Sequence, residues 1–481
     1  MLREERETLL VFSDVHLGSD LNDSGPVVAR SPTIDRDLAR LIAHYRDAAR
    51  SAGRWRIVIA GDFIDLAGMS VDPQEGDLVH TELTDEEREN GVGGAEDHGR
   101  LKLRRVAERH ADVFAELGAF VADGHAVTVL HGNHDLELHW DSLKDDLRDL
   151  VAAAAPEAER AAARARVEFA PWFFYRKDVV YIEHGHQYDP FCATPFVLSP
   201  LSPSDPRRVE RGFSATLLRA VVRRTEGMNE HGHEDRGLGS YFGWGVSLGA
   251  RGALALGARF AKAIAELAKN QRAYGSERAR AMARDHERRV AEHAHAARVK
   301  VDALRALLRL QARPIATTLH GVFASVMLDR LAVGLLVVLA LGVVIVLSQV
   351  GVLGGWGFVA AGALLAAWIA LHVLLSRGRG DVDPARQMFE RVARITELFP
   401  APLVVMGHTH VPVAVRVGGA TYINVGSWAE EHPDPRGDLR FNPNPNAYRA
   451  ARTHLVIRET DDGPDARFYE WDPESGPRLR A

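Results

Sequence analysis

The sequence predicts an α/β fold that is interrupted by a helical, membrane-spanning insertion. Five apolar, strand-like runs each end at a short cluster of polar residues, and strand ends bring side chains to one edge of a sheet. A separate stretch of 46 residues, 331–376, contains no Asp, Glu, Lys or Arg. The chain has 481 residues, which is enough for two domains or for one domain with a large insertion.

Each polar cluster follows one of the five runs, which cover residues 9–12, 57–60, 127–130, 179–182 and 403–406. The clusters are Asp14-Val15-His16, Gly61-Asp62-Phe63-Ile64-Asp65, Gly132-Asn133-His134-Asp135, His184-Gly185-His186 and Gly407-His408-Thr409-His410. They offer carboxylate, imidazole and amide ligands but no thiolate. That mixture suits Mn²⁺, Fe or Zn²⁺, and the number of ligands is enough for two ions. The sequence therefore predicts a two-metal hydrolase.

In this order the clusters match the patterns D-x-H, G-D-x-x-D, G-N-H-[DE], H-G-[HD] and G-H-T-H. The chain thus resembles the calcineurin-like metallophosphoesterase family, and its motif set is similar to that of UDP-2,3-diacylglucosamine hydrolases. The resemblance covers about residues 8–190 and 400–430. It implies a four-layer α/β/β/α sandwich and two divalent metal ions, with Mn²⁺ favoured over Fe or Zn²⁺.

The resemblance also implies a role for each motif residue. Asp62 would bridge the two ions. One ion would be held by Asp14, His16, Asp62 and His410, and the other by Asp62, Asn133, His184 and His408. His134 would assist catalysis at the phosphate, with Asp65 as the carboxylate that orients its ring. Asp135 is expected to support its loop, and the roles of His186 and Asp189 stay open.

Two departures from related enzymes narrow the expected activity. Protein Ser/Thr phosphatases continue the second motif with Arg-Gly, where this chain has Leu66-Ala67. Purple acid phosphatases need a tyrosine ligand at the position that Asp65 occupies here. Neither branch is therefore favoured.

The charge-free stretch predicts a transmembrane helical hairpin. Its two apolar segments, 331–350 and 356–375, are each close to the ~20 residues that cross a bilayer. The ligands lie both before and after the stretch, so an even number of crossings is required to assemble one site. Flanking arginines predict that the catalytic domain faces the cytoplasm, and the single cysteine, Cys192, fits a reducing compartment. The alternative is a pair of buried helices in a soluble domain.

The domain organisation follows from these features. We expect a first part of the catalytic domain (1–190), a connector or cap (191–258), a long basic helical segment (259–330), the hairpin (331–376) and a last part with the final motif and C-terminal strands (377–481). The basic segment could rest on anionic headgroups, or it could be a solvated helix that packs on the catalytic domain or on a second subunit. Residues 72–97 carry ten acidic residues against one arginine and are expected to form a mobile, solvated loop, with a lid over the site as the alternative.

The predicted function is hydrolysis of a phosphoester or pyrophosphate bond by metal-activated water, with His134 assisting. The substrate is expected to be membrane-associated and could be lipid-linked. The alternatives are a phosphodiesterase or phosphatase acting on a soluble nucleotide, with the hairpin only as an anchor, and a membrane scaffold or sensor with a structural metal site. The net charge of −6 argues against nucleic acid as a partner, and the oligomeric state is open.

Overall fold

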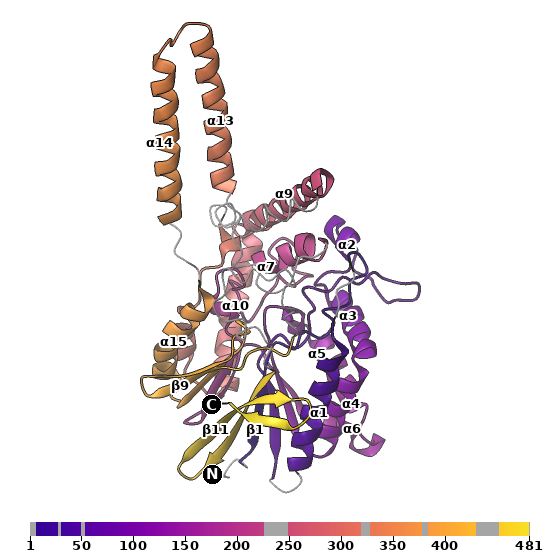
Figure 1. Cartoon of the computed structure of the whole chain (residues 1–481). Coiled ribbons are helices and arrows are strands. Elements are labelled where there is room, and N and C mark those ends of the chain that lie inside the picture. Colours follow the sequence, from indigo (N-terminus) through magenta and orange to yellow (C-terminus); the bar gives the residue numbers. More distant parts are fainter. Residues whose placement is uncertain are drawn as a thin grey trace.

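The computed structural model describes residues 6–26, 30–49, 53–225, 249–318, 328–377, 383–429 and 452–480. The fold is mixed α/β with two sheets (Figure 1). The seven-stranded sheet has the order β12 (Gly476–Leu479), β11 (Gly463–Asp472), β10 (Thr453–Thr460), β1 (Thr8–Phe12), β2 (Trp55–Ile59), β3 (Ala126–Leu130) and β4 (Val167–Ala170). The five-stranded sheet has the order β5 (Phe173–Arg176), β6 (Val180–Glu183), β7 (Leu403–Met406), β9 (Ala420–Asn424) and β8 (Val413–Val417).

Each of the five predicted apolar runs forms a strand, namely β1, β2, β3, β6 and β7. Strands β1 to β4 are parallel to one another, and β6, β7 and β9 are parallel within the second sheet. Parallel strands have their carboxyl ends at the same edge, where ligands bind in open α/β sheets. The five polar clusters therefore lie at the carboxyl ends of central strands.

Most residues of these strands are apolar because both faces of each strand are buried. Along β1, Leu9 and Val11 pack with side chains of the five-stranded sheet, whereas Leu10 and Phe12 pack with helices. Strand β7 alternates in the same way. Each fully buried aliphatic side chain contributes about 1.5–3 kcal/mol to the free energy of unfolding.

Helices pack against the other face of each sheet. The seven-stranded sheet shares a core with α1 (Pro32–Ala49), α3 (Glu96–Arg109), α4 (Ala111–Ala122), α5 (Asp141–Ala152) and α6 (Arg160–Ala165). The five-stranded sheet shares a core with α10 (Glu277–Ala296), α11 (Val301–Leu308) and α15 (Pro384–Leu398). Helix α15 begins at Pro384 because Asp383 caps it by accepting a hydrogen bond from the backbone of Arg386.

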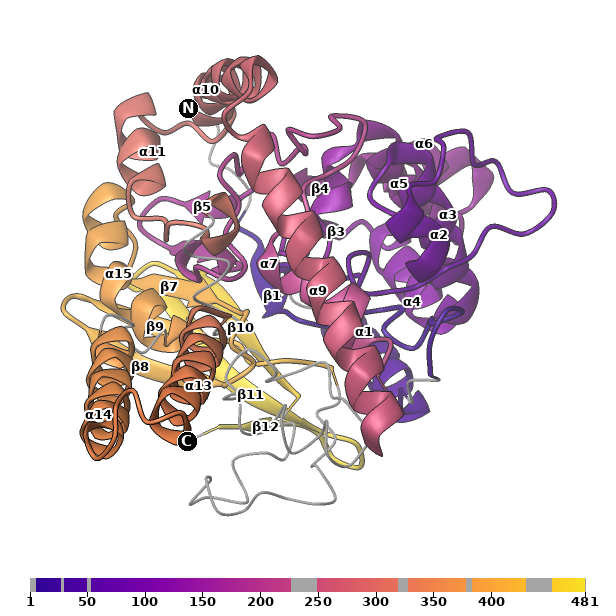
Figure 2. The same cartoon turned by 90° about the horizontal axis from the view of Figure 1, so that it is seen from above.

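The predicted long helical segment is divided into separate helices. Helix α9 (Gly249–Ala273) ends just before Gly275, and α10 begins after Ser276, whose hydroxyl accepts a hydrogen bond from the Ala279 amide. Helix α9 packs on α7 (Phe213–Leu217) through a separate apolar cluster (Figure 2). The apolar faces of α10 and α11 pack on the five-stranded sheet, so these two helices follow the second expectation for this segment, packing on the body of the protein.

The prediction of a transmembrane hairpin is wrong. Helices α13 (Leu328–Gln349) and α14 (Trp356–Arg377) form an antiparallel pair that projects from the body (Figure 1). In the part of the chain that the structure describes, no helix combines the length and apolarity that crossing a membrane requires. The prediction rested on the absence of charge and on the length of the two apolar segments, but eight of the 22 residues of α14 are Gly or Ala, which offer little apolar side-chain surface. This finding also overturns the predicted fold class, because that class included a membrane-spanning insertion. It likewise overturns the predicted location, a two-span membrane protein with its catalytic domain in the cytoplasm.

Two other expectations have different outcomes. Residues 72–97 are not simply a mobile, solvated loop, because they include α2 (Asp85–Asn90) and the buried side chain of Glu87. Tyr241, Phe242 and Trp244, which belong to the expected connector or cap, lie outside the described residues.

Candidate metal centre

The structure brings all seven predicted metal ligands, with His134 and Asp65, into one cluster at the strand ends. Among the residues that the structure describes, seven non-glycine residues have positive φ, and five of these are in this cluster: Asp14, His16, Asp62, His408 and His410. Such backbone conformations are unfavourable for L-residues and concentrate at functional sites. The short loops after β1, β2 and β7 thus adopt strained conformations where they present polar side chains to one another.

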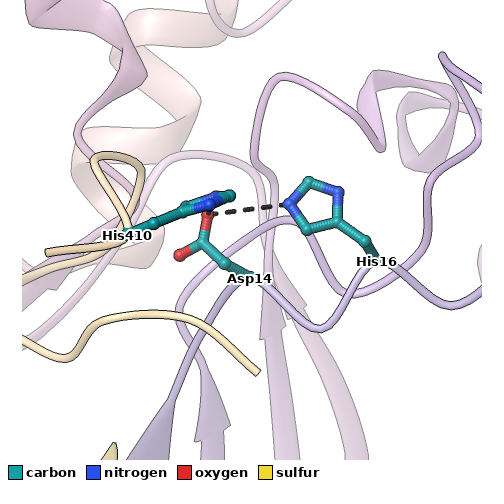
Figure 3. Close-up of side chains that lie close together, drawn as sticks. All are labelled: Asp14, His16 and His410. Carbon is teal, nitrogen blue, oxygen red and sulfur yellow. Dashed lines mark hydrogen bonds and ion pairs between the residues drawn. The ribbon is translucent and has the colours of Figure 1, made fainter. Parts of the chain in front are cut away.

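Asp14, His16 and His410 form the first group of candidate ligands (Figure 3). The ring of His410 donates from Nε2 to Asp14 Oδ1 over 3.0 Å, and His16 Nε2 lies 3.9 Å from the same oxygen. The other oxygen, Asp14 Oδ2, accepts the backbone amide of His408 at 3.1 Å and the hydroxyl of Ser13. These contacts fix the carboxylate between the first and last motifs.

Asp62 lies between the first group and the second. Its Oδ2 is 3.8 Å from His16 Nε2 and 3.2 Å from His184 Nε2, so one carboxylate meets a predicted ligand of each ion. His184 Nε2 also lies 3.1 Å from Asn133 Oδ1. On the other side of the ring, Nδ1 donates to the Ala60 carbonyl at 2.9 Å, which leaves Nε2 as the nitrogen that faces the cluster. This arrangement fits a bridging role for Asp62.

His408 occupies the far side of the second group. Its ring centroid lies 5.2 Å from that of His184, and its Nε2 donates to Asp189 Oδ2 at 3.0 Å. A carboxylate on one ring nitrogen fixes the tautomer and leaves the other, Nδ1, to bind a metal. Asp189 therefore orients His408. Cys192 lies close enough to form a further candidate group with these two residues.

The charges of the cluster suit a cation. Burial alone would raise the pKa of Asp14, but His410 and His184 lower it to about 2. Likewise, His184 and His134 hold the pKa of Asp62 well below its usual value despite burial. Burial opposes a proton on His184, yet the Asp62 and Asp14 carboxylates raise its pKa to about 9. A metal ion would replace that proton, because a histidine ligand must be deprotonated. The donor set and its burial therefore fit two divalent ions of the kind that bind oxygen and nitrogen.

His134 makes a separate contact with a carboxylate. Its Nδ1 donates to Asp65 Oδ1 at 2.6 Å, and its backbone amide donates to Asp62 Oδ1 at 2.8 Å. The side chain of His134 is 18% exposed, whereas that of Asp65 is 1% exposed. Burial would raise the pKa of Asp65, but His134 and then Arg223 keep it below its usual value. A buried, ionised partner holds the imidazole in one orientation at the edge of the cluster.

Two motif glycines are needed because the chain passes too close to these side chains for a Cβ atom. At Gly132 a Cβ would overlap the carboxylate and backbone amide of Asp62. At Gly407 it would overlap the hydroxyl of Ser13 and the carboxylate of Asp14. Substitution at either position would displace a candidate ligand.

The remaining motif residues support the loops. Asp135 accepts the backbone amides of Gly132 at 2.6 Å and Phe63 at 2.9 Å, which confirms its predicted loop role. Burial and the charge of Asp62 raise its pKa to about 7. His186 is buried behind the cluster, where Nε2 accepts a hydrogen bond from the Gln187 amide. Burial holds its pKa well below the usual value.

Sequence reasoning missed two groups beside the site. Arg223 forms an ion pair with Asp65 from a segment expected to be only a connector. Glu86 and Glu87, in the acidic stretch expected to be a solvated loop, pair with Arg208, Arg211 and Arg219. The only sequence signal for this pairing is the excess of arginine in the segment that contains Arg208, Arg211 and Arg219.

Glu183 gives the first testable prediction. Its carboxylate accepts hydrogen bonds from Tyr188 (2.7 Å) and Trp172 (3.1 Å), and burial raises its pKa from 4.5 to about 7. A raised pKa in the folded state stabilises the protein below pH 4.5, and this stabilisation is lost as the pH rises towards 7. In Glu183→Gln the group does not titrate. The wild-type free energy of unfolding should therefore fall relative to that of the variant by up to about 3 kcal/mol across this window.

Urea denaturation with a chelator present, at pH 5 and pH 8, measures this difference. The exposed Glu108→Gln variant is the control and should follow the wild type at both pH values. An equal difference between wild type and Glu183→Gln at the two pH values would contradict the prediction.

No family model matches the chain in comparisons with known proteins, and no curated protein matches it.

Proposed function

We propose that this chain is a metal-dependent phosphoric ester hydrolase with a dinuclear centre. The observation that carries the proposal is the position of the buried Asp62 carboxylate between His16 of one candidate ligand group and His184 of the other. A carboxylate with two oxygens, placed between two ligand groups, suits a pair of closely spaced ions. The His134–Asp65 pair beside it supports catalysis over a purely structural metal site.

The candidate ligands would hold two ions. Bound divalent ions would polarise the phosphoryl group and lower the pKa of a water molecule. Asp14, His16, Asp62 and His410 would hold one ion, and Asp62 with Asn133, His184 and His408 would hold the other.

His134 acts on the substrate. Asp65 accepts the Nδ1 proton of His134, so Nε2 is the nitrogen that donates a proton to the leaving oxygen or hydrogen-bonds a phosphoryl oxygen. The ring is more exposed than those of His408 and His410, as contact with a substrate requires.

The substrate class is a phosphoester or pyrophosphate. A lipid-linked substrate was suggested by the motif similarity and favoured further by the membrane hairpin, and the second of these arguments no longer stands. Mono- and diesters of phosphate are therefore the first substrates to test.

Purified protein should hydrolyse bis(p-nitrophenyl) phosphate or p-nitrophenyl phosphate when supplied with Mn²⁺. Chelation should abolish turnover, and Mn²⁺ in excess of the chelator should restore it. Calorimetric titration of the chelated protein should give two Mn²⁺ per chain. Binding of Mn²⁺ without hydrolysis of any monoester, diester or pyrophosphate would contradict the proposal.

A further inference from the structure

Arg223 contacts the proposed catalytic pair from a distant part of the chain. It lies 158 residues after Asp65 in sequence, yet its Nη2 donates to Asp65 Oδ2. Both side chains are 1% exposed. From Nη1 it also donates to the Ser19 carbonyl, in the loop after the first motif. The guanidinium thus joins the loops that follow β1 and β2.

The Asp65 carboxylate is held at both of its oxygens. Oδ1 accepts His134 Nδ1 at 2.6 Å and the Gly68 amide at 2.9 Å, while Oδ2 accepts Arg223. A buried carboxylate that loses one partner rotates, admits water or takes up a proton. Each of these changes would alter the orientation of the His134 ring.

The backbone that carries Arg223 has an uncommon conformation. Helix α7 continues as a π-helical turn, η4 (Leu218–Val222), and the Arg223 amide closes it by donating to the Leu218 carbonyl at 2.9 Å. Single π-helical turns are rare and occur frequently at functional sites.

Other arginines dock this turn on the body of the protein. Arg219 donates to the carbonyls of Met69, Asn90 and Gly91 at 2.8–3.1 Å. Arg224 donates to the Glu89 carbonyl at 3.1 Å and to that of Ser24. The turn is therefore fixed independently of Arg223, whose contact with Asp65 is a separate feature.

We propose that Arg223 is a positioning residue for the reaction: it fixes Asp65 in the orientation that accepts the Nδ1 proton of His134. This inference rests on the proposed function and assigns part of the active site to the segment that follows residue 190. Removing a residue that orients a catalytic group typically lowers activity about 10–100-fold. Arg223→Gln should therefore lower kcat by about that factor, with KM within about threefold of wild type.

Two substitutions separate positioning from docking. Arg223→Lys keeps a cation near Asp65 and should recover part of the lost kcat. Arg224→Gln removes a docking arginine that does not contact Asp65 and should leave kcat near that of wild type. In an Asp65→Asn background, Arg223→Gln should have little further effect, because both act through the same contact. Equal losses in Arg223→Gln and Arg224→Gln, or additive losses with Asp65→Asn, would overturn the proposal.

A second readout does not depend on activity. In protein labelled with ¹⁵N-histidine and loaded with Mg²⁺, Arg223→Gln should shift the His134 ring nitrogen resonances, assigned with His134→Ala, and Arg224→Gln should not. Unchanged His134 resonances in Arg223→Gln would overturn the positioning role even if the enzyme hydrolyses phosphoesters. Shifted resonances in a protein that hydrolyses none of the test substrates would retain the positioning role and contradict the proposed function.

Discussion

Asp62→Asn should bind at most one Mn²⁺ per chain and lose kcat by a factor on the order of 10³, as removal of a principal electrostatic group does. The Asp62 carboxylate lies within 3.8 Å of His16 Nε2 and 3.2 Å of His184 Nε2, and a neutral amide cannot bridge two cations as a carboxylate does. The metal-free variant should nevertheless fold, because Asn can still accept the His134 amide at Oδ1. Burial raises the pKa of Asp135, and loss of Asp62 would remove the charge that raises it further. Calorimetry with Mn²⁺ and steady-state hydrolysis of bis(p-nitrophenyl) phosphate measure both effects.

Asp37→Asn is the matched control for this experiment. Asp37 is also fully buried and pairs with Arg452 and Arg36, but it belongs to α1, away from the candidate ligands. Its substitution removes the same charge and should reduce stability while leaving Mn²⁺ stoichiometry at two. Two Mn²⁺ ions and near-wild-type kcat in Asp62→Asn would show that Asp62 does not bridge.

The candidate site could be predicted from the sequence because its information is local. Each strand and the ligand cluster that follows it are adjacent in the sequence, as in Leu403–Met406 followed by His408 and His410. The parallel order of the strands then brings the cluster ends together. The strained backbone at Asp14 and Asp62 was not predictable, since no glycine marks these positions.

Contacts between distant charges could not be predicted. Arg223 reaches Asp65 and Arg208 reaches Glu87 across 158 and 121 residues, and no periodicity indicates which arginine meets which acid. The acidic stretch was expected to be solvated because isolated charges avoid burial. Burial of the acidic side chains is favourable because arginines from a later segment of the chain form ion pairs with them.

His134→Ala should lower kcat by about 10²–10⁴-fold, the contribution of a general acid, which raises the activation free energy by roughly 3–5 kcal/mol. All seven predicted metal ligands remain in this variant, so Mn²⁺ stoichiometry should stay at two. The loss should be smaller for p-nitrophenyl esters than for alkyl esters, because a good leaving group needs less help from a proton. Hydrolysis of p-nitrophenyl phosphate and of glycerol 2-phosphate, followed by phosphate release, compares the two.

His110→Gln tests whether this loss reflects position or merely a broken histidine–carboxylate pair. His110 Nδ1 lies 2.6 Å from Asp35 Oδ2, the same distance as between His134 Nδ1 and Asp65 Oδ1, and its Nε2 accepts the Gly18 amide at 2.9 Å. His110 is buried and the pair lies outside the ligand cluster, so its loss should reduce stability by about 1–3 kcal/mol without changing the leaving-group dependence. A Mn²⁺ stoichiometry below two in His134→Ala would instead make His134 a ligand, as its proximity to His16 and Asp62 allows. The acid would then have to be sought elsewhere, since a nitrogen bound to metal cannot also carry the proton that the leaving oxygen needs.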